Sequence, residues 1–186
     1  MEGQMNSQTG ILVSIMAAFA LFLPAYAGKN DDNARTMKNV EKELVDASGK
    51  KAKVDLDGKD YVLVYYSAHW CPPCRAFTPE LVKFYNENRD KASFELIFAS
   101  SDKSEKDMKE YMSKMSMPWP AVDYKMIDKS GINKFAGNGI PCLVLLDKDR
   151  NVIADSFVGQ EYLGPQQVLD KFKVIIDKAK NEKSKK

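Results

Sequence analysis

Two cysteines separated by two prolines are the residues of this sequence best suited to chemistry. Residues 67–79 read Ser-Ala-His-Trp-Cys-Pro-Pro-Cys-Arg-Ala-Phe-Thr-Pro. Two cysteines three residues apart at the start of a helix can bring their sulfur atoms within bonding distance. The unpaired N–H groups and the dipole of a helix N-terminus favour a thiolate, and such a position lowers the pKa of a thiol from ~8.5 to about 3.5–7.5. The motif therefore predicts thiol–disulfide exchange, in which Cys71 attacks a disulfide and Cys74, one turn into the helix, resolves the product.

The prolines around the cysteines fit a helix that starts at the motif. Pro72 and Pro73 lack N–H groups, which the first turn of a helix does not need, and they stiffen the ring between the cysteines. Pro79 removes a hydrogen bond farther along the helix and predicts a kink there.

Other interpretations of the two cysteines stay open on these residues alone. A structural disulfide between them would close too small a loop to add much stability. A metal site needs four suitable ligands, and the sequence offers only His69, Cys71, Cys74 and Cys142 as histidine or cysteine ligands. The two-residue step from His69 to Cys71 fits no common zinc pattern, which weakens this interpretation. A metal- or cluster-binding carrier is therefore kept only as the second hypothesis. A redox-inactive module whose groove binds extended peptides is the third.

A buried strand precedes the motif and must position it. Residues 61–66 read Tyr-Val-Leu-Val-Tyr-Tyr, a continuous run that suits a central strand covered by helices on both faces. Apolar residues in the segment after the motif have the spacing of an amphipathic helix. Further strands are expected at 94–99, 140–146 and 152–157, a hairpin at 43–56, and helices at 108–115 and 168–179. Helices that alternate with strands, followed by a late hairpin, predict an α/β fold in three layers, an α/β/α sandwich.

The composition limits the class of protein. Of the 186 residues, 44% are apolar and 29% charged, which suits about one globular domain rather than a disordered or multi-span membrane protein. Basic residues exceed acidic ones by only 28 − 26 = +2, so no concentrated positive charge draws the chain to nucleic acid. Three cysteines and one histidine exclude a multi-bridge disulfide scaffold.

The first 27 residues are expected to lie outside the fold. As a helix, the apolar run at 11–23 would be about 20 Å long, short of the ~30 Å hydrocarbon core, and Pro-Ala-Tyr-Ala follows it. This pattern predicts a secretory signal peptide cut after Ala27, and so a periplasmic or extracellular protein whose disulfides persist. Residues 1–10 contain no lysine or arginine, and an uncleaved membrane anchor or a buried core helix are the alternatives.

Three segments of the sequence resemble one family. Residues 70–75, Trp-Cys-Pro-Pro-Cys-Arg, followed by Phe-Thr-Pro at 77–79, are similar to the active-site segment of thioredoxin-like proteins of the tryparedoxin and nucleoredoxin group. Residues 117–122, Met-Pro-Trp-Pro-Ala-Val, resemble a second segment of that group. Residues 139–141, Gly-Ile-Pro, resemble the family's cis-proline loop. The resemblance extends from about Glu43 to Phe172.

The resemblance implies a thioredoxin fold with a central mixed sheet, and a protein-disulfide reductase that uses no cofactor. The residues alone leave the direction open, and the reverse cycle would oxidise or exchange substrate disulfides. Cys71 would be the attacking thiol and Cys74 the resolving thiol. The substrate groove would be lined by Trp70, Pro72, Pro73, Ile140 and the cis residue Pro141. The expected partners are a disulfide-containing protein substrate and, for an exported protein, an unidentified membrane donor or acceptor of electrons. The small charge excess argues against nucleic acid, and the chain is expected to act as a monomer.

The expected division of the chain follows from these segments. A signal peptide at 1–27 precedes a linker or N-terminal segment at 28–42. The thioredoxin-like domain occupies 43–178, and a solvated basic tail follows at 179–186.

Three residues depart from the family pattern or add to it. Thioredoxins proper keep a buried aspartate six residues before the first cysteine, where this sequence has Tyr65, so no proton acceptor for Cys74 is identified. Cys142 stands where the family usually has threonine, and it is either a buried inert thiol or a regulatory thiol near Cys71. His69 is either simply exposed or a cation that favours the Cys71 thiolate. We therefore name His69 and Cys142 as candidate modulators.

Overall fold

The computed structural model describes residues 24–183 of the chain. Most of the expected signal peptide, including the whole apolar run at 11–23, lies outside the described residues. Within residues 24–183, no helix is both long enough and apolar enough to cross a bilayer.

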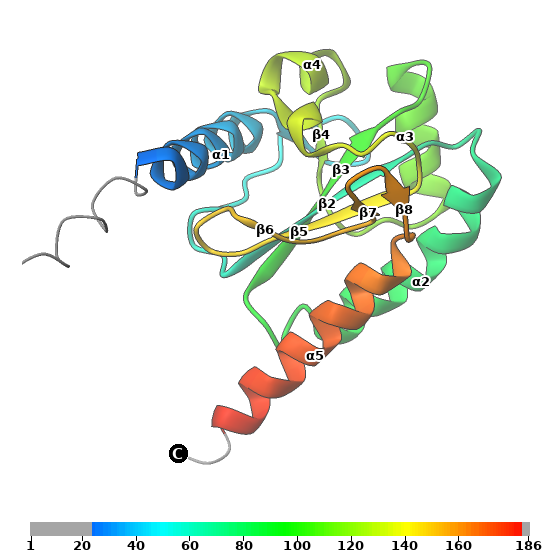
Figure 1. The fold of residues 1–186 in the computed structure, drawn as a ribbon. Coiled ribbons are helices and arrows are strands. Elements are labelled where there is room, and N and C mark those ends of the chain that lie inside the picture. The colour runs from blue at the N-terminus through cyan, green and yellow to red at the C-terminus, as the bar shows by residue number, and fades with distance from the viewer. Residues whose placement is uncertain (1–23, 184–186) are drawn as a thin grey trace, which may run out of the picture.

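A six-stranded mixed sheet forms the centre of the fold (Figure 1). The strands are β1 (Leu44–Val45), β2 (Tyr61–Ser67), β3 (Phe94–Ser100), β4 (Ala121–Val122), β5 (Cys142–Leu146) and β6 (Val152–Asp155), in the order β1-β4-β3-β2-β5-β6. The central strands β2, β3 and β4 run parallel, whereas β1, β5 and β6 pair antiparallel with their neighbours. The expected central mixed sheet is therefore confirmed.

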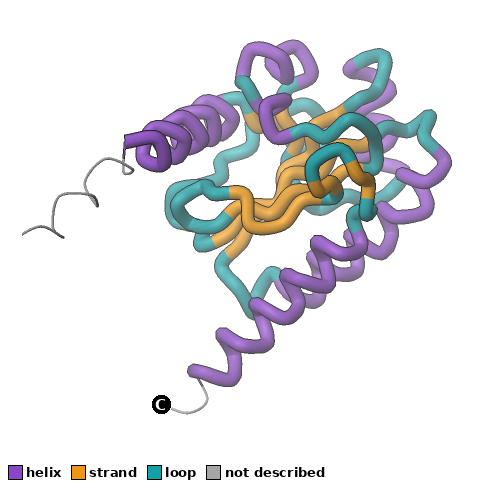
Figure 2. The backbone as a smooth tube through the Cα atoms, viewed as in Figure 1, coloured by secondary structure: helices purple, strands orange, loops and turns teal. Residues whose placement is uncertain are grey.

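Helices cover both faces of this sheet. They are α1 (Pro24–Lys42), α2 (Pro72–Asn88), α3 (Glu105–Lys114), α4 (Ile127–Ser130) and α5 (Gln166–Lys183), with short 3₁₀ turns at Tyr124–Met126 and Ile132–Phe135. Side chains alternate along β2, so that Leu63 and Tyr65 pack with α2, α3 and α5, whereas Val62 and Val64 pack with α1 and α4. Figure 2 shows the strands between these two helical layers. The three-layer α/β/α sandwich is confirmed.

The N-terminal segment differs from the sequence-based expectation. We expected residues 28–36 to form a polar linker, but α1 runs through them without interruption to Lys42. Long-range contacts explain the difference, because Met37 and Val40 are buried against the sheet and the Asn33 side chain donates a hydrogen bond to the carbonyl of Arg150 at 2.8 Å. The interpretation of this segment as a linker was therefore wrong, while the domain boundaries at 43 and 178 stay predictions.

The C-terminal elements also differ in extent. The strand expected to continue to Phe157 ends at Asp155, and the following residues form a separate two-stranded sheet of β7 (Phe157–Val158) and β8 (Glu161–Tyr162). Helix α5 continues to Lys183, so the start of the expected frayed tail is helical. The hairpin expected at 43–56 is reduced to one bridge between Val45 and Lys51, because β1 pairs with β4 instead.

Candidate active site

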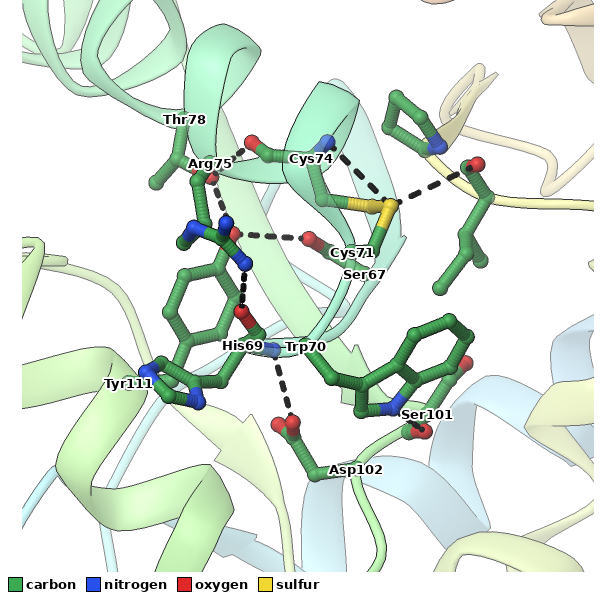
Figure 3. The surroundings of a disulfide bond; sticks show 12 residues. Ser67, His69, Trp70, Cys71, Cys74, Arg75, Thr78, Ser101, Asp102 and Tyr111 are labelled. Carbon is green, nitrogen blue, oxygen red and sulfur yellow. Dashed lines mark hydrogen bonds between the residues drawn. A yellow bond between two sulfur atoms is a disulfide. The ribbon is translucent and has the colours of Figure 1, made fainter.

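Cys71 and Cys74 lie where β2 gives way to α2, and they form a disulfide (Figure 3). Cys71 is the N-cap residue of α2, and its sulfur accepts a hydrogen bond from the N–H of Cys74 at 3.3 Å. Because Pro72 and Pro73 have no N–H, the first backbone donor of the helix is the one that points at the Cys71 sulfur. The same donor would stabilise a thiolate at Cys71 after reduction. Cys71 is 4% exposed and Cys74 fully buried. Their roles as attacking and resolving thiols stay predictions.

The proline loop lies directly against the disulfide. The Ile140–Pro141 peptide bond is cis, which confirms the expectation from the sequence. The Ile140 carbonyl oxygen lies 3.8 Å from the Cys71 sulfur, and the Tyr162 hydroxyl donates to the Pro141 carbonyl at 2.9 Å. The start of α2 and the proline loop, 69 positions apart in the sequence, thus meet at the Cys71 sulfur.

The other residues expected to line the groove are also at this site. The Trp70 side chain is 52% exposed, and its indole N–H donates to the Ser101 carbonyl at 3.1 Å, which fixes the ring beside the disulfide (Figure 3). Pro72 and Pro73 are exposed at the first two helical positions. Their roles in binding a substrate stay predictions.

The structure does not bring the two candidate modulators to the sulfur atoms. The His69 imidazole packs edge-on against Tyr111, with ring centres 6.0 Å apart, and Figure 3 shows it turned away from the disulfide. Cys142 lies in the core cluster under α1 and α4, apart from the cluster that holds Cys71. Burial raises the pKa of the Cys142 thiol to about 11, so at neutral pH it is protonated and unreactive. The geometry favours the inert interpretation of Cys142.

The same placement bears on the hypothesis of a metal carrier. That hypothesis requires His69, Cys71, Cys74 and Cys142 to converge, but Cys142 packs in the core cluster under α1 and α4, whereas Cys71 and Cys74 belong to a separate cluster. In the part of the chain that the structure describes, no group of three or more histidine, cysteine or acidic side chains is arranged to hold a metal ion.

A chain of buried hydroxyl groups lies beneath Cys74, which the sequence interpretation missed. It consists of Tyr65, Thr78, Tyr111 and Ser67, from β2, α2 and α3, with oxygen–oxygen distances of 2.9, 2.7 and 3.0 Å in that order. Thr78 donates to the Cys74 carbonyl at 2.8 Å, and the Tyr65 hydroxyl lies 3.3 Å from the same oxygen. Burial raises the pKa of Tyr65, so this residue stays neutral and supports the backbone of Cys74 rather than accepting its proton. Two hydroxyl residues two positions apart on one strand were the available signal.

Asp102 is the second residue that the sequence interpretation missed. It follows β3, is 7% exposed, and accepts a hydrogen bond from the backbone N–H of His69 at 2.7 Å. An acidic residue in a polar loop far from the motif gave no signal of this contact.

Comparison with known proteins places this geometry in a family. Residues 58–152 match the family model described as thioredoxin-like. Probable nucleoredoxin 1 from Arabidopsis thaliana is 48% identical over 94 residues, which are 50% of this chain and 16% of that protein. Tryparedoxin from Trypanosoma brucei brucei is 38% identical over 112 residues, 59% of this chain and 76% of that protein. The crystal structure of thioredoxin from Wuchereria bancrofti is similar with a TM-score of 0.56 and 36% identity, covering 73% of this chain and 96% of that one.

The mixed sheet, the disulfide at the start of α2 and the facing cis-proline define a protein of thioredoxin fold with a Cys-x-x-Cys redox site. The chain belongs to the thioredoxin-like family, and its relatives include nucleoredoxins and tryparedoxin, as its motifs predict. It spans only 16% of the Arabidopsis nucleoredoxin and 22% of the human one.

Proposed function

We propose that this protein reduces disulfides in protein substrates through a dithiol–disulfide cycle of Cys71 and Cys74. The observation that carries the proposal is the disulfide at the N-terminus of α2, with the Cys74 N–H directed at the Cys71 sulfur. The family to which the chain belongs supports thiol–disulfide exchange as the reaction class. The direction, reduction rather than oxidation, rests on the resemblance to tryparedoxins and nucleoredoxins.

The cycle balances in two exchange steps. The Cys71 thiolate attacks one sulfur of the substrate disulfide, a bond forms between them, and the other substrate sulfur leaves and takes up a proton. The Cys74 thiol then loses its proton and attacks the Cys71 sulfur, which closes the Cys71–Cys74 disulfide and releases the second substrate thiol. Two electrons pass from the protein to the substrate. An electron donor must then reduce Cys71–Cys74, and we propose a membrane partner for this step.

The wild-type protein tests this function directly. It should accelerate the reduction of insulin by dithiothreitol, and titration in denaturant should find three thiols in the reduced form and one in the oxidised form. A protein that showed no acceleration and no change of two thiols would instead fit the redox-inactive peptide-binding module.

We also propose that the protein is exported, with residues 1–27 as a signal peptide. The support is the apolar run at 11–23 followed by Pro-Ala-Tyr-Ala. Mass spectrometry of the protein isolated from its own cells should find Gly28 as the first residue. A full-length chain in the membrane fraction would indicate an uncleaved anchor, and one in the cytosol would contradict export.

A further inference from the structure

Asp102 is held in one orientation by its neighbours at the end of β3. One carboxylate oxygen accepts the His69 N–H at 2.7 Å, and the other accepts the Ser100 hydroxyl at 2.8 Å. The Asp102 N–H donates to the Ser100 Oγ at 3.0 Å, and the Asp102 carbonyl accepts the Tyr124 hydroxyl at 3.0 Å. These four hydrogen bonds leave the carboxylate little freedom to turn away from His69.

Burial of the Asp102 carboxylate is unfavourable because it removes a charged group from water. Burial raises the pKa of Asp102, whereas the hydrogen bonds from Ser100 and His69 oppose that rise. Within residues 24–183, no lysine or arginine forms an ion pair with Asp102. A buried carboxylate without a lysine or arginine partner is unfavourable unless its hydrogen bonds compensate, and here one of them goes to the loop that carries the redox motif.

The loop between β2 and Cys71 is fixed on several sides. Asp102 binds the N–H of the His69 peptide unit, while the Arg75 guanidinium donates to the His69 carbonyl (Figure 3). The indole N–H of Trp70 donates to Ser101, whose own N–H donates to the Ser67 carbonyl at 2.8 Å. The segment that follows β3 therefore determines where the chain enters α2.

We propose that Asp102 is a positioning residue for the redox site. Its carboxylate holds the His69 peptide so that Cys71 keeps the extended N-cap conformation, φ −89° and ψ 109°, in which its sulfur accepts the Cys74 N–H. That N–H stabilises the Cys71 thiolate only while the cap geometry persists in the reduced protein. The inference rests on the proposed function in one respect, because it takes Cys71 as the attacking thiol.

A positioning role and a purely electrostatic role of Asp102 predict opposite shifts in the pKa of Cys71 when Asp102 is removed. A negative charge near a thiol disfavours its thiolate, so if Asp102 acted only through its charge, its removal would lower the pKa of Cys71. If it acts by holding the loop, its removal disturbs the N-cap and raises the pKa of Cys71 toward the ~8.5 of free cysteine. The direction of the shift therefore separates the two roles.

The experiment compares Asp102→Ala with Asp102→Asn in the full chain. The pKa of Cys71 is read from the rate of alkylation of the reduced protein against pH, and the His69 amide is followed by hydrogen exchange with NMR detection. We expect the alanine variant to raise the pKa of Cys71 by about one unit, which leaves about tenfold less thiolate at pH values well below that pKa, and to speed exchange of the His69 amide at least tenfold. Asparagine retains a carbonyl acceptor for the His69 N–H, so it should restore both values to nearly those of the wild type.

Asp147→Ala is the matched control. Asp147 also accepts backbone N–H groups, those of Asp149 and Asn151 at 2.9 Å each, but in the turn between β5 and β6. Its replacement should lower stability and leave the pKa of Cys71 unchanged. If Asp102→Ala does not fold, Ser100→Ala takes its place, because it removes the hydroxyl that holds the other carboxylate oxygen and should give a smaller rise of the same sign.

The positioning role would be overturned if the pKa of Cys71 in Asp102→Ala stayed the same or fell. It would also be overturned if the pKa rose equally in Asp102→Asn. These readouts need no substrate, so their result is independent of the insulin assay. A protein that fails to reduce insulin but shows the expected shift would refute the proposed function alone.

Discussion

Replacing Cys74 with serine should stop turnover and leave substrates covalently bound to Cys71. In the structure Cys71 is 4% exposed, whereas Cys74 is fully buried, so Cys71 is the more accessible of the pair. A serine hydroxyl cannot displace a sulfur from a mixed disulfide, but the backbone N–H at position 74 still donates to the Cys71 sulfur. The first exchange step should therefore proceed and the second should not, with a loss of turnover of at least about a thousandfold.

The adduct provides the measurement. After incubation of reduced Cys74→Ser protein with a peptide disulfide, mass spectrometry should find one half of the peptide on Cys71, and dithiothreitol should remove it. Cys71→Ser is the control, and it should show neither turnover nor adduct because it lacks the attacking thiol and the remaining Cys74 and Cys142 are both 0% exposed. An adduct on Cys142, or insulin reduction by Cys71→Ser at the wild-type rate, would contradict the mechanism.

The parts of the site that the sequence predicts are those whose residues lie close together along the chain. The strand, the motif and the start of α2 are contiguous, so the apolar run and the Cys-Pro-Pro-Cys spacing suffice to place the sulfurs at a helix N-terminus. The cis-proline loop lies 69 positions from Cys71, and only the family resemblance connected the two. Continuous apolar runs likewise predict the long strands well, because the side chains of these strands are buried on both faces of the sheet.

What the sequence did not predict depends on contacts between distant polar residues. The bond from His69 to Asp102 joins residues 33 positions apart, and each residue taken alone resembles an ordinary loop residue. The polar segment at 28–36 becomes helical although its own composition favours a linker, because the following turns of α1 are buried against the sheet. Tyr65 shows the same limit, since its partners Thr78 and Tyr111 are known only from the packing of helices on β2.

Replacing Arg150 with alanine should lower the free energy of unfolding by about 3 kcal/mol. Like His69 and Tyr65, Arg150 has partners far away in the sequence. The residue lies in the turn between β5 and β6, yet it is only 3% exposed. Its guanidinium donates to the carbonyls of Leu56, Lys59 and Asp147, the latter two at 3.3 and 3.2 Å. The side chain thus joins the turn before β2 to the turn after β5.

The expected magnitude follows from the number of donors lost. A hydrogen bond to a charged group contributes about 1.5–3 kcal/mol, and three carbonyls would lose this donor together. Water that enters the volume left by the guanidinium would bind some of these carbonyls and restore part of the lost free energy. We therefore expect a loss of about 3 kcal/mol rather than the sum for three hydrogen bonds. Arg150 has φ +64°, and alanine would keep that unfavourable backbone conformation, so the substitution offers no compensating relief.

Urea denaturation of the two oxidised proteins measures the difference, provided that the m value is unchanged. Lys148→Ala is the matched control, because it removes one positive charge from the same turn, and the Lys148 side chain is exposed. It should change the free energy of unfolding by no more than about 0.5 kcal/mol. Arg150→Lys should be intermediate, since one ammonium group cannot reach all three carbonyls in the geometry of a guanidinium. A loss below about 1 kcal/mol in Arg150→Ala, or an equal loss in Lys148→Ala, would show that the buried guanidinium does not stabilise the fold through these contacts.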